Sequence, residues 1–263
     1  MIHLRLRSRN FSCKPLKQIE VPIPVIYRMG STTPLNKIFK KRIPKKYLEI
    51  NSIQACRLSG DKYLMKKRFN HARIKSAPWF TINSKDHNNQ RIQHYLNKWN
   101  IIIAKRYNSS KGKGIYLIKS LEDYFKFRTQ IQNEHYYVED FIFERYYTYT
   151  KEYRIHVTKN KYFYACRKML IENAQDRWHR HGNNSIFIYE ENPKFDKPQN
   201  WNEIVNECIN ALKALKLDIA AFDVKVSKKG DFIIMESNSA PALGERGIQE
   251  YTKIIKEWID LNI

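Results

Sequence analysis

The alternation of apolar and polar positions predicts a β-hairpin over residues 222–241, FDVKVSKKGDFIIMESNSAP. Two apolar runs flank a Lys-Lys-Gly turn, which is the pattern of paired strands. The first strand presents Asp223, and the second presents Glu236 and Asn238 near its end. Side chains two positions apart on a strand share a face, so Glu236 and Asn238 point the same way. We expect Asp223 to lie beside them on the neighbouring strand.

Further strands are predicted earlier in the chain. An apolar run from Ile101 and the run IYLIK at 115–119 flank the turn NSSKGKG, which predicts a second hairpin. Three aromatic-rich runs follow as strands, at 136–142, 152–158 and 161–169.

Helices are predicted from apolar spacing and from capping residues. Asp61 and Ser120 each precede a helix as an N-cap, because their side-chain oxygens can accept hydrogen bonds from the free amides of the first turn. Apolar residues recur at helical spacing in 92–99, 201–215 and 248–262. This order of elements predicts an α+β fold with antiparallel sheets, not a doubly wound α/β fold.

Composition and cysteine spacing narrow the class of protein. The chain has 263 residues and 42% hydrophobic content, enough for a substantial core. It contains no run of eighteen apolar residues, and no apolar segment follows the N-terminal arginines, so we expect neither a membrane span nor a secretory signal. The four cysteines lie far apart without a C-x-x-C pair, which favours reduced thiols and a cytoplasmic location.

The net charge of +22 is concentrated near the N-terminus. Residues 1–75 hold 19 Lys and Arg against three acids, a net charge of +16, and the remaining 188 residues carry 29 basic and 23 acidic groups, a net of +6. A basic region of this kind could attract nucleic acid, an acidic polypeptide or another polyanion. The alternative is a Lys-rich, AT-biased coding composition, so charge alone names no partner.

Asp223, Glu236 and Asn238 form the first candidate site. Mg²⁺ prefers hard oxygen ligands and keeps several waters, so two carboxylates and an amide are a suitable partial shell. The alternative is a polar strand edge whose side chains are only solvated.

The turn NSSKGKG at 108–114 is the second candidate. Glycine lets backbone amides approach a phosphate closely, although a strand follows this turn, so it is not a P-loop. The alternative is an ordinary hairpin tip. Lys105, near the end of the preceding apolar strand, is costly there unless it meets an anion.

Two arginine-containing segments complete the candidate chemistry. Glu152 and Arg154 share one face of a predicted strand, and Arg is suited to grip a phosphate or carboxylate; the alternative is a cross-strand ion pair. The loop 176–184, DRWHRHGNN, has two histidines but no third metal ligand nearby, so we expect it to face an anion or a substrate instead of a metal; the alternative is plain solvent exposure. No arrangement of histidine, serine or cysteine suggests a covalent nucleophile.

The order of these motifs resembles the ATP-grasp superfamily, closest to its carboxylate–amine ligases of the glutathione-synthetase and ribosomal-protein glutamyl-ligase type. The resemblance covers roughly residues 50–250. Its most specific parts are IIIAKRYNSSKGKGIYLIKS, similar to the family's "vvKp-gs-GkGv-li-s", and MESNSAP, similar to "E-x-N-x-x-P". It implies two α+β subdomains, at 58–138 and 139–263, that clasp ATP. Residues 1–57 would form a short basic lobe preceding them.

The resemblance also implies roles for individual residues. Lys62 and Lys105 would contact the ATP phosphates, and Lys105 would also lie near the adenine. Arg154 would face the transferred phosphate, and Glu152 would bind ribose. The lid over the phosphates would consist of Ser109, Ser110, Lys111, Gly112, Lys113 and Gly114. The hinge against adenine would consist of Glu139, Asp140, Phe141 and Ile142. The ligands of Mg²⁺, or alternatively Mn²⁺, would be Asp223, Glu236 and Asn238. The family's substrate-holding R-x-N run is absent, so Arg177, His179 and Arg180 are assigned to substrate by position alone.

The implied reaction is ATP-dependent formation of an amide or peptide bond. A carboxylate would take the γ-phosphoryl group, and an amine would capture the acyl-phosphate, with catalysis by positioning and charge neutralisation. The basic N-terminal region would suit an acidic peptide or protein substrate. The main alternative is a catalytically inactive ATP-grasp-like protein that binds nucleic acid or another polyanion. A carboxylase-like or kinase-like branch ranks lower, since nothing resembles a biotin site.

Overall fold

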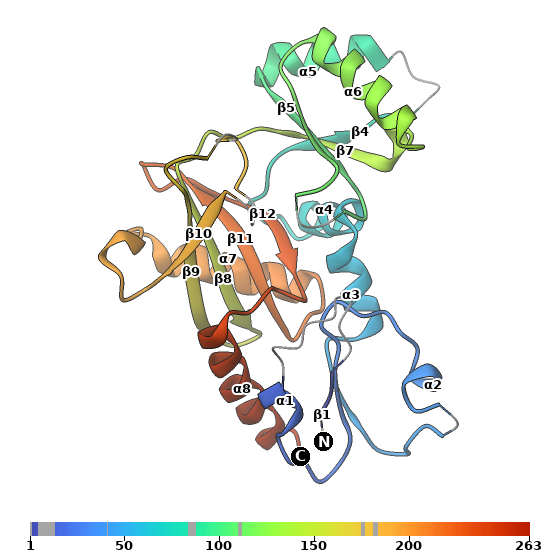
Figure 1. The fold of residues 1–263 in the computed structure, drawn as a ribbon, viewed down its shortest axis with the longest axis vertical. Helices are drawn as coiled ribbons and strands as arrows, with labels where there is room; N and C mark the ends of the chain where they lie inside the picture. Colours follow the sequence, from blue (N-terminus) through green and yellow to red (C-terminus); the bar gives the residue numbers. More distant parts are fainter. Residues whose placement is uncertain are drawn as a thin grey trace.

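The computed structural model describes residues 2–4, 14–40, 42–83, 88–109, 112–174, 177–180 and 184–263. The chain forms three sheets that follow one another along the long axis of the molecule (Figure 1). Within the described ranges, no helix combines the length and the apolar character that crossing a membrane requires.

The N-terminal lobe contains a three-stranded parallel sheet in the order β1-β2-β3. Its elements are β1 (Ile2–Leu4), α1 (Lys14–Lys17), β2 (Val25–Tyr27), α2 (Leu35–Ile38) and β3 (Leu48–Ile50). Apolar side chains of this lobe, such as Leu16 and Val25, pack against the last helix, α8 (Glu245–Asp260), in one buried cluster. The two ends of the described chain therefore lie close together (Figure 1).

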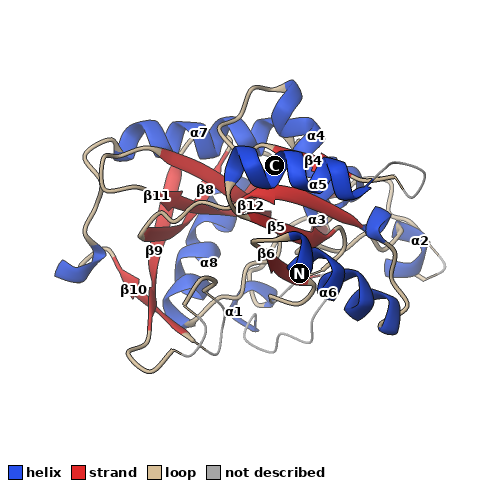
Figure 2. Cartoon of the chain, turned by 90° about the horizontal axis from the view of Figure 1, so that it is seen from above, coloured by secondary structure: helices blue, strands red, loops and turns tan. Residues whose placement is uncertain are grey.

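The central sheet has five antiparallel strands in the order β10-β9-β8-β11-β12. The strands are β8 (Lys151–Thr158), β9 (Tyr162–Leu170), β10 (Ser185–Tyr189), β11 (Ile219–Val226) and β12 (Phe232–Asn238). The amphipathic helix α7 (Trp201–Ala214) covers one face of this sheet (Figures 1 and 2). Helices α3 (Ile53–Gly60) and α4 (Lys62–His71) add Ala55, Met65 and Phe69 to the same core. The short helix η3 (Pro193–Phe195) lies in the connection between β10 and α7.

A separate four-stranded antiparallel sheet has the order β4-β7-β5-β6. The strands are β4 (Trp79–Thr81), β5 (Ile102–Arg106), β6 (Ile115–Ile118) and β7 (Phe141–Arg145). Helices α5 (Asn88–Trp99) and α6 (Leu121–Asn133) contribute Ile92, Leu96 and Phe127 to its core, and the 3₁₀ helix η2 (Val138–Asp140) precedes β7.

The α+β class and the main elements agree with the sequence prediction. Both predicted hairpins form, and Asp61 and Ser120 cap α4 and α6 by accepting hydrogen bonds from Leu64 N and Asp123 N. The predicted strand over 136–142 is wrong in its first part, because residues 138–140 form η2. Strands β4 and β10 are not predicted, and the N-terminal sheet is parallel.

Strand β7 has a bearing on the expected subdomain boundary. It pairs with β5 and with β4, so the four-stranded sheet continues past residue 138, where the first subdomain was expected to end. The division of the chain at residues 57 and 138 stays a prediction.

Candidate functional site

The central sheet has one apolar face and one polar face, because side chains alternate along β8 and β11. On β8, Tyr153, Ile155 and Val157 point into the core beneath α7, and Glu152, Arg154 and His156 point the other way. On β11, Phe222, Val224 and Val226 lie in that core, and Asp223 and Lys225 lie on the opposite face. All eight residues of β11 are buried, so its two charged side chains need partners.

Strand register brings the predicted residues of three strands together. Arg154 pairs with Asp223, and Asp223 pairs with Glu236 on β12. The pairing shifts after Asp223, where Val224 lies opposite Ile234, so β12 has one extra residue in a β-bulge. A bulge of this kind re-aims the side chains beside it, here Glu236.

Asp223 is the most strongly paired acid of this face. Its carboxylate accepts hydrogen bonds from Arg154 Nε at 2.7 Å and Nη2 at 2.9 Å, and from Lys168 Nζ at 3.2 Å. Burial by itself would raise the pKa of Asp223, but the Arg154 guanidinium and the Lys168 ammonium outweigh burial and hold the pKa well below its ordinary value. Asp223 is therefore ionised at neutral pH.

Glu152 is held by two cations on the same face. It accepts hydrogen bonds from Lys168 Nζ at 3.0 Å and from Arg180 Nη1 at 3.4 Å, and only 2% of the residue is exposed. Beside it, burial lowers the pKa of Lys225 to about 8, and Lys225 Nζ donates to Tyr147 O at 3.1 Å.

Lys62 and Lys105 form a second cationic group, supplied by α4 and by the four-stranded sheet. Lys62 Nζ donates to Ser109 O at 2.6 Å and to Ser109 Oγ at 3.3 Å. Lys105 Nζ donates to Glu144 Oε2 at 2.7 Å. Glu236 favours the charged form of both lysines and also of Arg154, so its carboxylate connects the two groups electrostatically.

Positive charge exceeds negative charge in this combined cluster. Among the described residues, its cations are Lys62, Lys66, Lys105, Arg154, Lys168, Arg180 and Lys225, and its carboxylates are Glu144, Glu152, Asp223 and Glu236. Seven cations face four carboxylates, or five when Asp61 at the start of α4 is included. Cations buried in excess of acids favour an anionic ligand with several charges.

The glycine-containing turn closes the β5–β6 hairpin beside Lys62. Gly112 and Gly114 have φ of 75° and 64°, a backbone conformation that glycine adopts without steric cost. A Cβ on Gly114 would lie 3.1 Å from Arg106 Cβ, so this position also needs a small residue. Lys113 lies in the same turn, and Ser110 and Lys111 lie outside the described residues. The role of this turn as a lid stays a prediction.

The predicted hinge segment spans the end of η2 and the start of β7. Glu139 and Asp140 belong to η2, and Phe141 and Ile142 are fully buried at the start of β7. The carbonyl of Asp140 accepts a hydrogen bond from Tyr107 N at 2.9 Å, which ties this segment to the residue after β5.

The loop residues assigned to substrate are separated by the structure. Arg180 reaches the cluster through Glu152. Arg177 is exposed and donates to Glu172 O at 3.3 Å, and His179 packs its ring against Trp178. The structure thus brings one of the three residues into the cluster.

The predicted metal ligands offer a donor set that fits Mg²⁺. Asp223, Glu236 and Asn238 share the polar face and supply carboxylate and amide oxygens. Within the described part of the chain, the Asn238 amide nitrogen is buried without a hydrogen-bond partner, so the protein does not hold this end of the amide. Among those same residues, no group of three or more His, Cys, Asp or Glu could hold a metal, so the fit depends on Asn238 as the third ligand.

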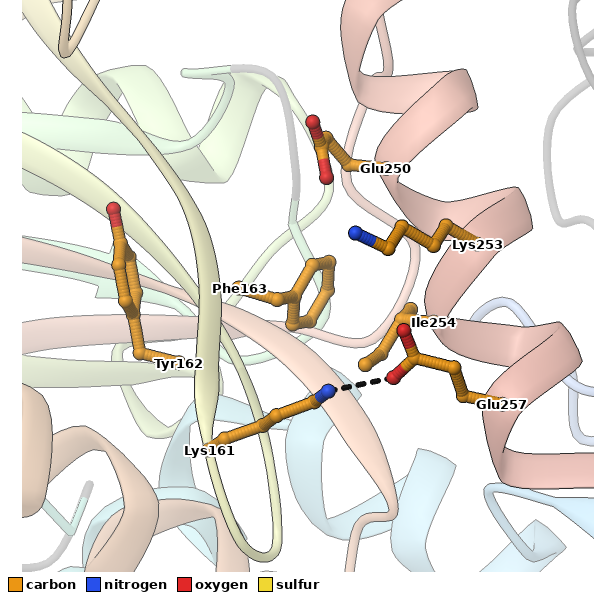
Figure 3. A pocket seen from close by; sticks show the side chains of 7 residues that line it. All are labelled: Lys161, Tyr162, Phe163, Glu250, Lys253, Ile254 and Glu257. Carbon is orange, nitrogen blue, oxygen red and sulfur yellow. Dashed lines mark hydrogen bonds and ion pairs between the residues drawn. The ribbon is translucent and has the colours of Figure 1, made fainter. Parts of the chain in front are cut away.

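A surface pocket lies away from this cluster, between the start of β9 and α8 (Figure 3). Lys161 and Glu257 form an ion pair of 2.6 Å across it, and Phe163 and Ile254 line its apolar side. Its volume is about 190 Å³, below the roughly 300 Å³ of small ligand sites. The polar face of the central sheet is therefore the better candidate for a functional site.

Sequence reasoning missed three residues of the cluster: Lys66, Glu144 and Lys168. Glu144 carried a usable signal, since an acid inside the apolar run FIFER needs a partner as much as Lys105 does. Lys168 carried none, because its partners Glu152 and Asp223 lie on other strands and become visible only with the register.

Solved structures with a similar fold are found at low sequence identity. A D-alanine–D-alanine ligase from Bacillus anthracis matches with a TM-score of 0.66 and 12% identity, covering 97% of this chain and 91% of that chain. A D-alanyl-alanine synthetase A from Vibrio cholerae matches with a TM-score of 0.64 and 13% identity, covering 91% of this chain and 76% of that chain. The ATP-grasp ligase PsnB complexed with minimal precursor matches with a TM-score of 0.62 and 12% identity, covering 93% of this chain and 81% of that chain. The chain therefore has the ATP-grasp fold.

Comparisons by sequence give no match. No family model matches the chain, and no curated protein matches it either. Any inference about function therefore depends on the fold and on the residues of the cluster described above.

Proposed function

We propose that this protein is an ATP-dependent carboxylate–amine ligase that forms an amide or peptide bond through an acyl-phosphate. One observation carries the proposal: in a chain of ATP-grasp fold, buried cations of the central sheet, α4 and the four-stranded sheet lie near the carboxylates of Asp223 and Glu236. PsnB, a protein of similar fold, has been solved with Mg and ADP. A polyphosphate with a divalent cation matches the surplus of positive charge in this cluster.

In the proposed reaction, a substrate carboxylate oxygen attacks the γ-phosphorus of ATP, and the bond from that phosphorus to the bridging oxygen breaks to release ADP. The amine nitrogen then attacks the acyl carbon. The C–N bond forms, the C–O bond to phosphate breaks, and the amine proton passes to solvent or to the departing phosphate.

The cations of the cluster would stabilise the charge of the transferred group. Arg154 and Lys168 lie beside the carboxylate of Asp223, and Lys62 of α4 and Lys105 of the four-stranded sheet approach from the other side. Preorganised cations of this kind stabilise negative charge that develops in the transition state. None of these groups needs to act as a general base.

Asp223, Glu236 and Asn238 would hold Mg²⁺. When bound, Mg²⁺ supplies charge neutralisation at the phosphate oxygens. Arg154 fixes the orientation of the Asp223 carboxylate through two parallel hydrogen bonds, which keeps that ligand in place.

We further propose an acidic peptide or protein as one substrate. The N-terminal lobe reaches the end of the site, because Gly30, with φ of 69°, would place a Cβ 3.1 Å from Ala240 Cβ, two residues after Asn238. This lobe belongs to the region of residues 1–75 that carries a net charge of +16. Charge complementarity would speed the encounter with an acidic substrate and make it salt-dependent.

ADP release in the presence of Mg²⁺ tests the proposal, with single amino acids and glutamate-rich peptides as substrates. Glu236→Ala should reduce the rate roughly a hundredfold or more, because it removes a metal ligand. The matched control is Glu257→Ala in the surface pocket, which should leave the rate unchanged. A wild-type protein that binds no ATP at millimolar concentration would refute the ligase proposal. Binding of nucleic acid without ATP binding would support the inactive alternative.

A further inference from the structure

Glu144 is a buried carboxylate held between two lysines from different parts of the fold. It lies on β7, with 3% of the residue exposed. Its Oε2 is 2.7 Å from Lys105 Nζ on β5, and its Oε1 is 3.1 Å from Lys66 Nζ on α4. Helix α4 lies between the four-stranded sheet and the central sheet (Figure 1), so the three side chains connect two cores.

The register of the four-stranded sheet directs Glu144 and Lys105 to one face. Glu144 lies opposite Ile103, and Lys105 lies opposite Ile142, so the two charged residues are diagonal neighbours on adjacent strands. Diagonal neighbours of this kind are within reach of long side chains. The pairing therefore follows from the antiparallel register and not from a mobile surface contact.

The two lysines differ in what else surrounds them. Lys66 is fully buried, and its Nζ also donates to Ala77 O at 3.2 Å. The Lys105 side chain is 12% exposed, and the carboxylates of Glu236 and Glu152 also favour its charged form. Lys66 thus anchors Glu144 on the inner side, and Lys105 extends from Glu144 toward the cluster.

The charge balance of this trio leaves one cation uncompensated. Burial would raise the pKa of Glu144, but Lys105 and Lys66 outweigh it and lower that pKa, so the carboxylate is ionised. Burial lowers the pKa of Lys66. Burial would also lower the pKa of Lys105, but Glu144, together with Glu236 and Glu152, outweighs burial and raises it. One carboxylate serves two ammonium groups, and an anion from outside would complete the pairing.

We infer that Glu144 is a positioning residue, which fixes the Lys105 ammonium toward the phosphates of the nucleotide and is itself fixed by Lys66. An ammonium has three donors, and Glu144 takes one of them at Lys105, which leaves two for phosphate oxygens. This inference rests on the proposed function, because it requires a nucleotide in the cluster. The inference concerns the phosphate contacts of Lys105, and it predicts that the binding of adenosine does not depend on Glu144.

The test compares the binding of ATP·Mg²⁺ and of adenosine by calorimetry, for the wild type, Glu144→Gln, Lys105→Met and the double variant. Glu144→Gln should weaken ATP binding about tenfold or more, as expected for the loss of a charge-assisted contact, and leave adenosine binding unchanged. The double variant should bind ATP as Lys105→Met does, because Glu144 acts through Lys105. Glu122→Gln, on an exposed ion pair of α6, is the matched control and should change neither affinity.

Three results would overturn the inference: an ATP affinity of Glu144→Gln within twofold of the wild type, an equal loss for adenosine and ATP, or a double variant weaker than Lys105→Met. If Glu144→Gln does not fold, Glu144→Asp retains the charge but shortens the reach to Lys105. It should then weaken ATP binding several-fold and spare adenosine. A wild type that binds no ATP refutes the proposed function together with this inference, whereas ATP binding that is indifferent to Glu144 refutes the inference alone.

Discussion

Replacing Lys168 by Met tests whether the polar face of the central sheet is held together by its buried charges. Lys168 Nζ lies 3.0 Å from Glu152 Oε1 and 3.2 Å from Asp223 Oδ2. The three side chains are 10%, 3% and 1% exposed, so water cannot replace the lost ammonium without opening the sheet. Met fills a similar volume, which confines the change to the charge.

The expected cost follows from what each acid retains. Asp223 keeps both hydrogen bonds from Arg154, whereas Glu152 keeps, among the described residues, the 3.4 Å contact with Arg180 alone. Breaking a buried ion pair costs about 3–5 kcal/mol, and the retained partner at Asp223 places this case near the lower limit, about 3 kcal/mol. For a chain of this size, that corresponds to a fall in Tm of about 6–12 °C.

Urea denaturation followed by circular dichroism measures this loss. Adding Glu152→Gln should recover at least about 1 kcal/mol, because it removes the acid left without a full partner. Lys126→Met is the matched control, since Lys126 pairs with Glu122 at the exposed surface of α6 and should give no measurable change. The reasoning is refuted if Lys168→Met is as stable as the control, or if Glu152→Gln destabilises it further.

Three further predictions address other parts of the fold. Burial lowers the pKa of His156 to about 3, below the value in the unfolded chain. The contribution of His156 to stability is therefore complete above about pH 6.5 and is lost as pH falls. In urea titrations, His156→Gln should remove about 2 kcal/mol of the loss of stability between pH 7 and pH 5. Gly114→Ala should lower the free energy of unfolding by about 1–2 kcal/mol, because φ is 64° and the new Cβ would crowd Arg106. The control is Gly244→Ala, which should not lower it, since φ of Gly244 is −75°. Equal losses in the two variants would contradict the strain argument. Asn51→Ala should cost about 2–4 kcal/mol by calorimetry, since its side chain hydrogen-bonds the backbone of Asp218 and Ile219, and a loss below 1 kcal/mol would contradict that reading.

The sequence by itself determined the α+β class, both hairpins and the caps of α4 and α6. These features depend on local chemistry: alternation sets the faces of a strand, and the Asp61 and Ser120 side chains satisfy nearby amides. It also indicated which polar groups of the apolar strands call for a partner: Lys105 as a costly cation, and Asp223 and Glu236 as candidate metal ligands. Each is a residue whose cost of burial is visible from its immediate neighbours.

Only the tertiary structure decided which charges meet. Lys168 is recognisable as a partner of Glu152 and Asp223 only when β8 lies between β9 and β11, a strand order that no local pattern specifies. Lys66 joins Glu144 because α4 packs against β7, a strand that follows it only much later in the chain. Ion pairs between elements depend on register and strand order, which are set by the packing of the whole core, so periodicity within one element cannot predict them.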